Sequence, residues 1–480
     1  MDSLLWKDNL PMSPHFIIII FFLVATTFVS VAKTASNISK ESLSDMAITA
    51  QKIASEYHEM GWFSGSLLMA KDGKIFFNAS YGFEDKNKKT KNAINTKFNL
   101  GSIMKNFTKV LVLQQIESEK LSLNDTLDMF DFGFPKGLSS NVTVEHLLNH
   151  TSGFGDIFTA QYRENPLAFD TLEKKLQLLK KKPLLFEPGT GHSYSNYGYI
   201  VLGAILEKVT NQPFERLLTK NIFERIDLKN TSFKVDSSAK HQSTRYTYLY
   251  DGSLKEVGVT EHPSPDGGIE STVKDVQEFY RELFYGSILL NRSSQTVSQA
   301  FAMTGEHWGT YGGGLGVSAA VDVNLVDGIE IVVLANTDNL VAEFISTRIQ
   351  SFIKTGTYQE ITPLEINYAY NLYKEKGKDS FYRDFKGKYT QSGYSKFIGR
   401  TINELGMQLL TTESWKEAFD IFNYLVAIFP DAAQAYDSLA FAHLSKGEPN
   451  TAHKMFQKAL DIKSDFNSDY VSNNYRQAAR

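Results

Sequence analysis

Residues 98–109 read FNLGSIMKNFTK, and the rest of the chain is organised around this stretch. A hydroxyl, Ser102, and an amine, Lys105, stand three residues apart where an apolar run begins. In a helix, residues at this spacing lie on one face, so the two side chains can touch. A serine nucleophile whose activating base is not a histidine needs this arrangement. The Ser-x-x-Lys spacing occurs five times, beginning at Ser30, Ser102, Ser237, Ser271 and Ser351, so context must choose among them.

Length and composition indicate a globular protein of more than one domain. A chain of 480 residues suggests about two to three domains, and 42% hydrophobic residues are enough to build a large core. The net charge is −4, so no basic excess points to a nucleic acid partner. Cysteine is absent, which excludes disulfides and thiolate metal sites.

An uncharged apolar run covers residues 16–32. Its 17 residues lie between the length of a signal-peptide core and that of a short membrane span. The small residues Ser30-Val31-Ala32 are suited to cleavage before Lys33. Residues 1–35 are therefore predicted to be a cleaved signal peptide or a retained membrane anchor. Either one predicts an exported protein, periplasmic or membrane-anchored and facing the periplasm or the outside.

Two hairpin patterns lie far apart in the chain. Apolar runs at 66–70 and 75–77 flank Asp72-Gly73, and runs at 317–321 and 329–334 flank Asp327-Gly328. Helical patterns fill the region between them, and further helices are expected over 272–283 and 341–353. The sequence therefore predicts an α+β fold, with one antiparallel sheet built from both ends of the region, flanking helices and an all-helical insertion.

The pattern changes after about residue 355. Residues 356–400 are charged and rich in tyrosine, and they are predicted to form a helical linker. A 34-residue offset then relates Leu405 to Leu439, Leu410 to Leu444, Ala418 to Ala452, and Phe422 to Phe456. This period resembles the tetratricopeptide repeat, so residues 401–470 are predicted to be helical repeats. They either bind a protein partner or only dock on the preceding domain, because stacked repeats need about three units to be stable alone.

Two further motifs complete the chemistry. Tyr-x-Asn occurs only at Tyr194-Ser195-Asn196, although the chain has 23 tyrosines. A free phenol is a weak base, but a nearby ammonium such as that of Lys105 favours its ionised form. The amide of Asn196 offers a donor and an acceptor, which suits it to orienting the lysine and a substrate amide. The third motif is the glycine-rich stretch 311–318, where Gly313 or Gly314 can donate a main-chain N–H that pairs with that of Ser102 as an oxyanion hole.

Together, and in this order, the three motifs resemble the serine β-lactamase and penicillin-binding-protein-like superfamily, specifically its class C-type branch with carboxypeptidase and esterase relatives. The resemblance covers about residues 45–355 and includes several further stretches. These are 63–66 and 70–74, 117–125, 144–153, 198–203, 267–272 and 333–336. It implies a β-lactamase-like catalytic domain at 45–355. Ser102 would be the nucleophile, Lys105 its partner, and Tyr194 the general base and acid, while Asn196 would position the substrate.

The third motif departs from the family pattern, which begins with Lys or His, then any residue, then Gly. Counting back from the strand end at 334–336 gives Tyr311-Gly312-Gly313, and we predict that Tyr311 begins the motif and contacts substrate. The alternative, His307-Trp308-Gly309, lies four residues further away. An aromatic residue there resembles esterase-like members, and the loss of a cation weakens the case for a substrate carboxylate.

These motifs predict a serine hydrolase acting on a small-molecule or peptide-like ester or amide, including D-amino-acid peptides and β-lactams. The alternative is a penicillin-recognising or degenerate binding protein that does not turn over and uses the C-terminal repeats for protein contacts. The ten histidines form no cluster at metal-ligand spacing, so His146, His150 and His192 are predicted to be structural, with no metal and no cofactor.

Overall fold

The computed structural model describes residues 40–234, 239–259, 261–291, 300–301, 305–466 and 468. The predicted export segment at 16–32 lies outside these residues. The chain divides into two compact units, which are described separately. One takes in the described residues up to Tyr248 together with Leu254–Ile361, and the other takes in Leu249–Ser253 and the residues from Thr362 onward. Of the helices that the structure describes, none is long and apolar enough to span a membrane.

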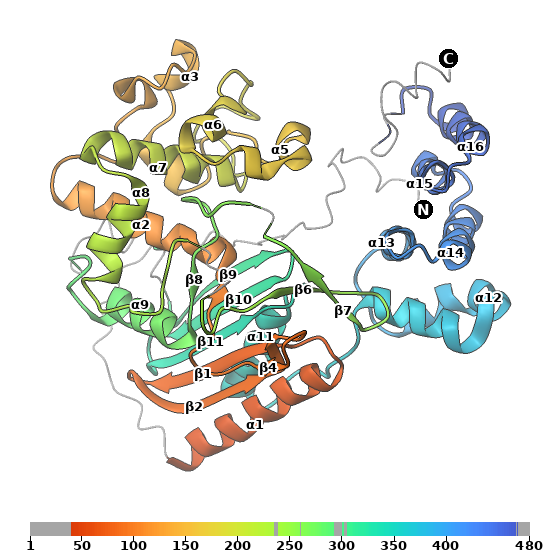
Figure 1. Ribbon diagram of the computed structural model, residues 1–480, viewed down its shortest axis with the longest axis horizontal. Helices are drawn as coiled ribbons and strands as arrows, with labels where there is room; N and C mark the ends of the chain where they lie inside the picture. Colours follow the sequence, from red (N-terminus) through yellow and green to blue (C-terminus); the bar gives the residue numbers. More distant parts are fainter. Residues whose placement is uncertain are drawn as a thin grey trace. The chain divides into compact units, whose positions relative to one another are not determined.

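A five-stranded antiparallel sheet forms the centre of the first unit, as the sequence predicts (Figure 1). Its strand order is β2-β1-β11-β10-β9, and its strands are β1 Gly65–Lys71, β2 Lys74–Tyr81, β9 His307–Gly314, β10 Val317–Asn324 and β11 Ile329–Ala335. Asp72 and Gly73 join β1 to β2 with φ of 48° and 77°, the positive values that a two-residue hairpin turn requires. Gly65 of β1 pairs with Ala335 of β11, so the two ends of the unit meet inside the sheet.

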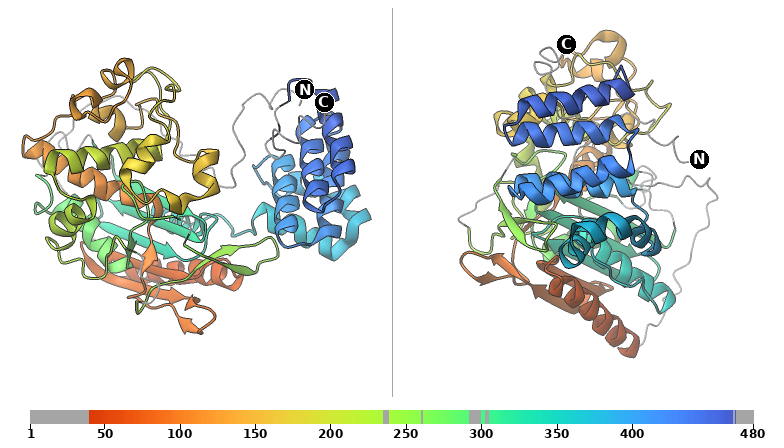
Figure 2. Two further views of the ribbon diagram at one scale, coloured as in Figure 1. Left: turned by 45° about the horizontal axis from the view of Figure 1, so that its top comes forward. Right: turned by 90° about the vertical axis from the view of Figure 1, so that its right-hand side faces the viewer.

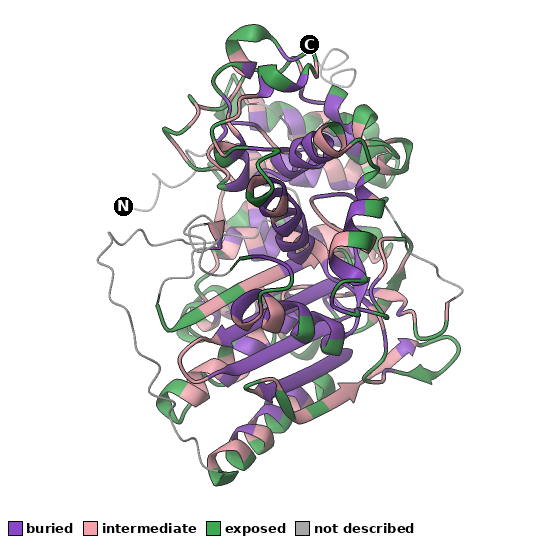
Figure 3. Cartoon of the chain, turned by 90° about the vertical axis from the view of Figure 1, so that its left-hand side faces the viewer, coloured by how far each residue is buried: buried purple, intermediate pink, exposed green. Residues whose placement is uncertain are grey.

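Helices cover both faces of this sheet. Helix α11, Val341–Thr355, packs on β10 and β11 and also contacts α1, Lys40–Glu59. Helices α2, Met104–Glu117, and α9, Val273–Tyr285, lie on the opposite face. There Phe107 of α2 stacks on Phe279 of α9 with ring centroids 3.8 Å apart. Both helices share one hydrophobic core with β10 and β11, and Figure 3 shows the strands as largely buried. This buried packing holds the start of α2 against the sheet.

Apart from the 15-residue α7, the remaining elements of the unit are short. The helical insertion contains η2 Leu127–Phe130, α3 Lys136–Ser139, α4 Val144–Leu148, α5 Ala160–Glu164, η3 Pro166–Ala168, α6 Leu172–Gln177, α7 Asn196–Thr210, α8 Phe214–Leu218 and η4 Thr219–Phe223. Three two-stranded ribbons pair β3 Phe83–Asp85 with β4 Thr90–Lys91, β5 Phe98–Asn99 with β8 Glu270–Ser271, and β6 Arg245–Tyr248 with β7 Leu254–Val257. The ribbon of β5 and β8 leads directly into the stretch that holds Ser102.

The second unit is helical (Figure 2). Its helices are α12 Glu365–Gln391, α13 Ile398–Thr411, α14 Trp415–Ile428, α15 Ala433–Ser445 and α16 Pro449–Ile462. Helix α12 is interrupted at Gly377, where φ is 76°, and its Phe381 and Phe385 lie in the same hydrophobic core as α13 and α14. The residues predicted as a linker therefore contribute to the core of this unit. Ala418 of α14 and Ala452 of α16, one 34-residue offset apart, are both fully buried.

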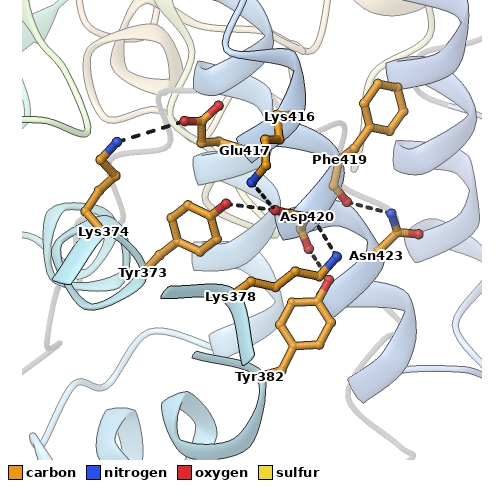
Figure 4. Close-up of polar contacts among 9 residues, drawn as sticks. All are labelled: Tyr373, Lys374, Lys378, Tyr382, Lys416, Glu417, Phe419, Asp420 and Asn423. Atoms are coloured by element: carbon orange, nitrogen blue, oxygen red, sulfur yellow. Dashed lines mark hydrogen bonds and ion pairs between the residues drawn. The ribbon is translucent and has the colours of Figure 1, made fainter. Parts of the chain in front are cut away.

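Asp420 joins α12 to α14 through a polar cluster in which Asp420 and Tyr373 are buried and the lysines are exposed (Figure 4). Its carboxylate accepts hydrogen bonds from Tyr373 OH at 2.8 Å, Lys378 Nζ at 2.7 Å and Lys416 Nζ at 3.3 Å. Burial opposes ionisation of this carboxyl, but the three donors outweigh it and hold the pKa of Asp420 below its usual value. The charged form of Asp420 therefore stabilises the helical unit.

Replacement of Asp420 by Asn should destabilise the helical unit by about 1 kcal/mol near neutral pH, because the buried Tyr373 hydroxyl loses a charged acceptor while the two lysines are exposed to solvent. A lowered folded-state pKa contributes stability above the unfolded-state pKa, roughly 4, and this contribution is lost as the pH falls through the folded-state pKa. The measurement is amide hydrogen exchange of α12 and α14 in the intact chain. The variant should exchange faster than wild type at pH 7, and the two exchange rates should become equal at acid pH. The exposed Asp431→Asn serves as the matched control. Equal exchange at pH 7 would contradict the role given to Asp420.

Candidate active site

Ser102 lies in a single turn of 3-10 helix, η1 Gly101–Ile103, directly before α2. Gly101 takes φ of 51°, and its N–H donates to Asn99 Oδ1 at 2.9 Å. The other end of the Asn99 amide donates to Glu270 Oε1 at 3.0 Å. The turn before the helix is therefore fixed by β5 and β8, and it presents Ser102 at the N-terminal end of α2.

Lys105 lies one turn further along and is 5% exposed. Its Nζ donates to Ser102 Oγ at 3.2 Å, to Asn196 Oδ1 at 2.7 Å and to the main-chain oxygen of Asp266 at 2.5 Å. An ammonium has three hydrogens, and each has an acceptor here. Lys105 is thus held in one orientation, with one of its hydrogens directed at the predicted nucleophile.

Tyr194 reaches Ser102 from the segment that precedes α7. Its OH donates to Ser102 Oγ at 2.7 Å, and Lys105 Nζ lies 4.9 Å from the centre of the Tyr194 ring. Ser195 caps α7 by accepting from the Gly198 N–H at 3.1 Å, so Asn196 becomes the first residue of that helix. The Tyr-x-Asn spacing therefore places the phenol just outside the helix and the amide on its first turn, with both side chains directed at Lys105 and Ser102.

His150 lies beside this pair, where the sequence predicted only a structural histidine. Its ring centroid is 4.5 Å from that of Tyr194, and its Nδ1 accepts from the Ser195 N–H at 3.2 Å. Burial, and then the charge of Lys105, lowers the pKa of His150 well below its usual value. The imidazole is neutral, so it supports the position of Tyr194 without adding a charge to the site.

The glycine-rich strand β9 runs against the turn that holds Ser102. A Cβ on Gly312 would overlap the main-chain oxygen of Leu100 and lie 3.1 Å from Ser102 N. A Cβ on Gly101 would lie 2.8 Å from Gly313 N. The two backbones can approach this closely only because both positions are glycine. Gly313 therefore lies next to Ser102, while Gly314 pairs with Val317 at the end of the β9–β10 hairpin.

The Tyr311 side chain, predicted to contact substrate, is not directed at Ser102 in the structure. Tyr311 OH donates to Asp322 Oδ1 at 3.0 Å, and His307 Nε2 lies 3.1 Å from the same oxygen. Asp322 also accepts from Ser346 of α11, so this cluster is on the sheet face that α11 covers. Side chains alternate along a strand, and Gly312 faces the Ser102 turn, so the residues on either side of it face away.

The same alternation corrects the register of the third motif. Thr310 is on the side of α2, where its Oγ1 accepts from Asn106 Nδ2 at 3.1 Å. The glycine that abuts the nucleophile turn is Gly312, one residue earlier than the sequence predicted. The motif at this place is Thr310-Tyr311-Gly312, and neither Tyr311 nor His307 begins it. Strand periodicity alone did not reveal this shift, because three consecutive glycines leave the register undefined.

Sequence reasoning also missed two further groups at the site. Asp266, whose main-chain oxygen accepts the hydrogen bond from Lys105, lies in the stretch 263–268, where prolines and glycines indicate only a turn. Asp156 holds the amide of Asn196, with its two carboxylate oxygens 3.1 and 3.0 Å from Asn196 Nδ2. No sequence pattern marked this aspartate. Within the described part of the chain, no group of three His, Cys, Asp or Glu residues is placed to hold a metal ion.

Comparison with known proteins gives an independent view of this arrangement. A family model described as Beta-lactamase matches residues 50–350, well over half of the chain. Protein flp of Staphylococcus aureus (strain N315) is 30% identical over 186 residues, which cover 38% of this chain and 37% of that protein. Penicillin-binding protein 4* of Bacillus subtilis (strain 168) is 27% identical over 253 residues, which cover 49% of this chain and 55% of that protein. The chain thus spans less than two thirds of the length of either relative.

Solved structures share the fold. The penicillin binding protein from Bacillus halodurans matches with a TM-score of 0.56 at 26% identity, over 63% of this chain and 98% of that one. EstCE1, a hydrolase with promiscuous acyltransferase activity, matches with a TM-score of 0.55 at 22% identity, over 67% of this chain and 100% of that one. The second likeness shows the fold alone. On the match of the family model and on this fold, the chain belongs to the β-lactamase family.

Proposed function

We propose that this protein is a serine hydrolase that transfers the acyl group of an ester or amide first to Ser102 and then to water. One observation carries the proposal. Ser102 Oγ accepts hydrogen bonds from Lys105 Nζ at 3.2 Å and from Tyr194 OH at 2.7 Å, so the nucleophile already contacts both groups that would manage its proton. The catalytic domain would correspond to residues 45–355.

The proposed reaction follows from these contacts. In the reactive form of the site, Tyr194 is the phenolate beside the Lys105 ammonium, and it accepts the proton of Ser102 Oγ as that oxygen attacks the carbonyl carbon of the substrate. The main-chain N–H groups of Ser102 and Gly313 stabilise the oxyanion of the tetrahedral intermediate. Tyr194 then protonates the leaving group, which departs and leaves the acyl group on Ser102. Water activated by the same pair hydrolyses the ester and restores the serine hydroxyl.

The charges around Ser102 favour substrates without a carboxylate at the third motif. On the described length of β9, the side chain that faces α2 there is Thr310, which carries no charge. Lys109, one turn beyond Lys105, donates to the main-chain oxygen of Ala300 at 2.7 Å, and burial lowers its pKa to about 8. A carboxylate needs a charge-assisted partner to bind well, so neutral esters and amides are the proposed substrates ahead of β-lactams. Penicillin-binding proteins and the hydrolase EstCE1 are among the structures with this fold.

Turnover tests this proposal directly. We expect the exported protein to hydrolyse a short-chain p-nitrophenyl ester faster than a chromogenic cephalosporin, and intact-mass analysis to detect an acyl adduct on Ser102. The ester is expected to be favoured because it carries no carboxylate, and the third motif has no cation that would bind one. If neither substrate is hydrolysed and no adduct forms on Ser102, the proposal that the protein is a serine hydrolase is refuted. Preference for the cephalosporin would refute the substrate class alone.

The second candidate is a penicillin-recognising protein that acylates slowly or does not turn over. The missing cation at the third motif favours it, because a site that cannot orient its substrate loses rate. In that case the helical repeats at 401–470 would supply the protein contacts. Stable acylation of Ser102 without hydrolysis would identify this alternative.

We further propose that residues 16–32 direct export, either as part of a cleaved signal peptide or as a membrane anchor. The length and apolar composition of this run support the proposal. Intact mass of the exported protein distinguishes the two forms, because cleavage before Lys33 removes the first 32 residues.

A further inference from the structure

Asp156 lies next to the site, and its carboxylate has no role in the proposed mechanism. It follows α4 on the segment Gly153–Asp156, and two hydrogen bonds tie this segment to its surroundings. Ser195 Oγ donates to Gly155 O at 2.9 Å, and the Leu185 N–H donates to Gly153 O at 2.7 Å. Asp156 Oδ1 itself accepts from the Ile157 N–H at 2.6 Å. The carboxylate is thus held in place independently of Asn196.

The two ends of the Asn196 amide differ chemically, and Asp156 distinguishes them. Both oxygens of Asp156 accept from the amide, so the donor end of the amide faces the carboxyl group. Both oxygens of Asp156 lie within 3.1 Å of Asn196 Nδ2. This leaves the acceptor end, Oδ1, directed at Lys105 Nζ at 2.7 Å. The reverse orientation would place an N–H group against the three donors of Lys105.

The position of Asp156 is also costly for the fold. Burial raises the pKa of Asp156, while the hydrogen bond from Asn196 and the charge of Lys105 act in the opposite direction. Asp156 is half-buried, and a carboxylate partly removed from water is seldom favourable for stability alone, while such groups concentrate at functional sites. The cost is consistent with a role in arranging the site.

We propose that Asp156 is a positioning residue that fixes the orientation of the Asn196 amide and, through it, the alignment of Lys105 with Ser102. This inference rests on the proposed serine hydrolase function. Asp156 does not contact Ser102 and takes no part in proton transfer. Every effect of Asp156 on the reaction therefore passes through Asn196, and this claim can be tested.

A double-mutant cycle tests whether Asp156 acts only through Asn196. Asp156→Asn keeps the size of the side chain but supplies a donor, which allows the Asn196 amide to turn over. We expect kcat for a p-nitrophenyl ester to fall about 10–100-fold, with KM changing less than about threefold, because an interaction that serves the transition state is lost. Asn196→Ala should cost at least as much. The double variant should be no slower than Asn196→Ala, because both changes remove the same contact.

The rate at which a fluorophosphonate labels Ser102 is measured in parallel, since it reports activation of the nucleophile in a protein that does not turn over. Labelling should slow in Asp156→Asn by a factor similar to that for kcat, while the melting temperature stays within a few degrees of wild type. Asp156→Glu, which restores an acceptor-only group, should recover part of the lost rate. The exposed Asp170→Asn is the matched control and should behave as wild type.

The outcomes separate the two proposals. Additive losses in the double variant, or a loss of rate that follows a loss of melting temperature, would overturn the positioning role and leave the hydrolase standing. Unchanged rates in Asp156→Asn would do the same. A wild-type Ser102 that is neither acylated by substrate nor labelled would overturn the hydrolase, and the positioning role with it.

Discussion

Replacement of Ser102 by Ala should reduce ester turnover by at least about four orders of magnitude, because removal of a nucleophile leaves only the contribution of substrate binding and oxyanion stabilisation. The fold should be unaffected. The hydroxyl accepts bonds from Lys105 and Tyr194, and both of those side chains keep other contacts in the structure. Turnover and intact mass after incubation with substrate measure the two consequences, which are loss of rate and loss of the acyl adduct.

The chain supplies its own control for this experiment. Ser351 also stands three residues before a lysine, Lys354, but it lies on α11, where its Oγ donates to Thr357 O at 3.0 Å. Ser351→Ala should therefore hydrolyse esters at the wild-type rate. Retained turnover in Ser102→Ala would refute the assignment of the nucleophile, whatever the Ser351 variant does.

Replacement of Gly312 by Ala should lower kcat/KM about 10²–10³-fold, which is the cost of losing one oxyanion-hole donor. The added methyl group would overlap the main-chain oxygen of Leu100, so either β9 or the turn before α2 must move. Movement of either one separates Gly313 N from Ser102 N. Because both segments are backbone, the overlap cannot be relieved by a change of rotamer.

Gly137→Ala is the matched control, since a Cβ there meets nothing within 4 Å. Melting temperatures of both variants separate a displaced strand from general unfolding, and activity is compared only if both remain folded. Near-wild-type kcat/KM in a folded Gly312→Ala protein would contradict both the place of Gly313 in the oxyanion hole and the register Thr310-Tyr311-Gly312.

Much of the fold could be predicted because its signals are local. The Asp72-Gly73 and Asp327-Gly328 turns each lie between apolar runs, and both hairpins form with strands that contain these runs. No local pattern in the sequence predicts that the segments of Ser102, Tyr194 and Gly313 meet. This meeting was expected through the family resemblance, because no spacing in the sequence brings residues about 90 or more positions apart into contact.

The errors and omissions at the site have different physical origins. Tyr311 was expected at the site because strand alternation needs a reference point, and a run of glycines offers none. Asp156 was missed because its role depends on a single amide 40 residues away, a contact that no periodicity encodes. The domain boundaries and the repeat character of residues 401–470 stay predictions.

The pairing of Gly65 with Ala335 also bears on how this protein acquires activity. Strands that are adjacent in the sheet but 270 residues apart in the chain close a long loop, and such non-local pairing folds slowly. The first hairpin, β1 and β2, must wait for β11 before the sheet is complete, and β9 is positioned by the same late event. During synthesis, Ser102 is therefore present in the chain long before β9, the strand that would complete its site. If the protein is exported unfolded, its chemistry would begin only after the sheet has closed.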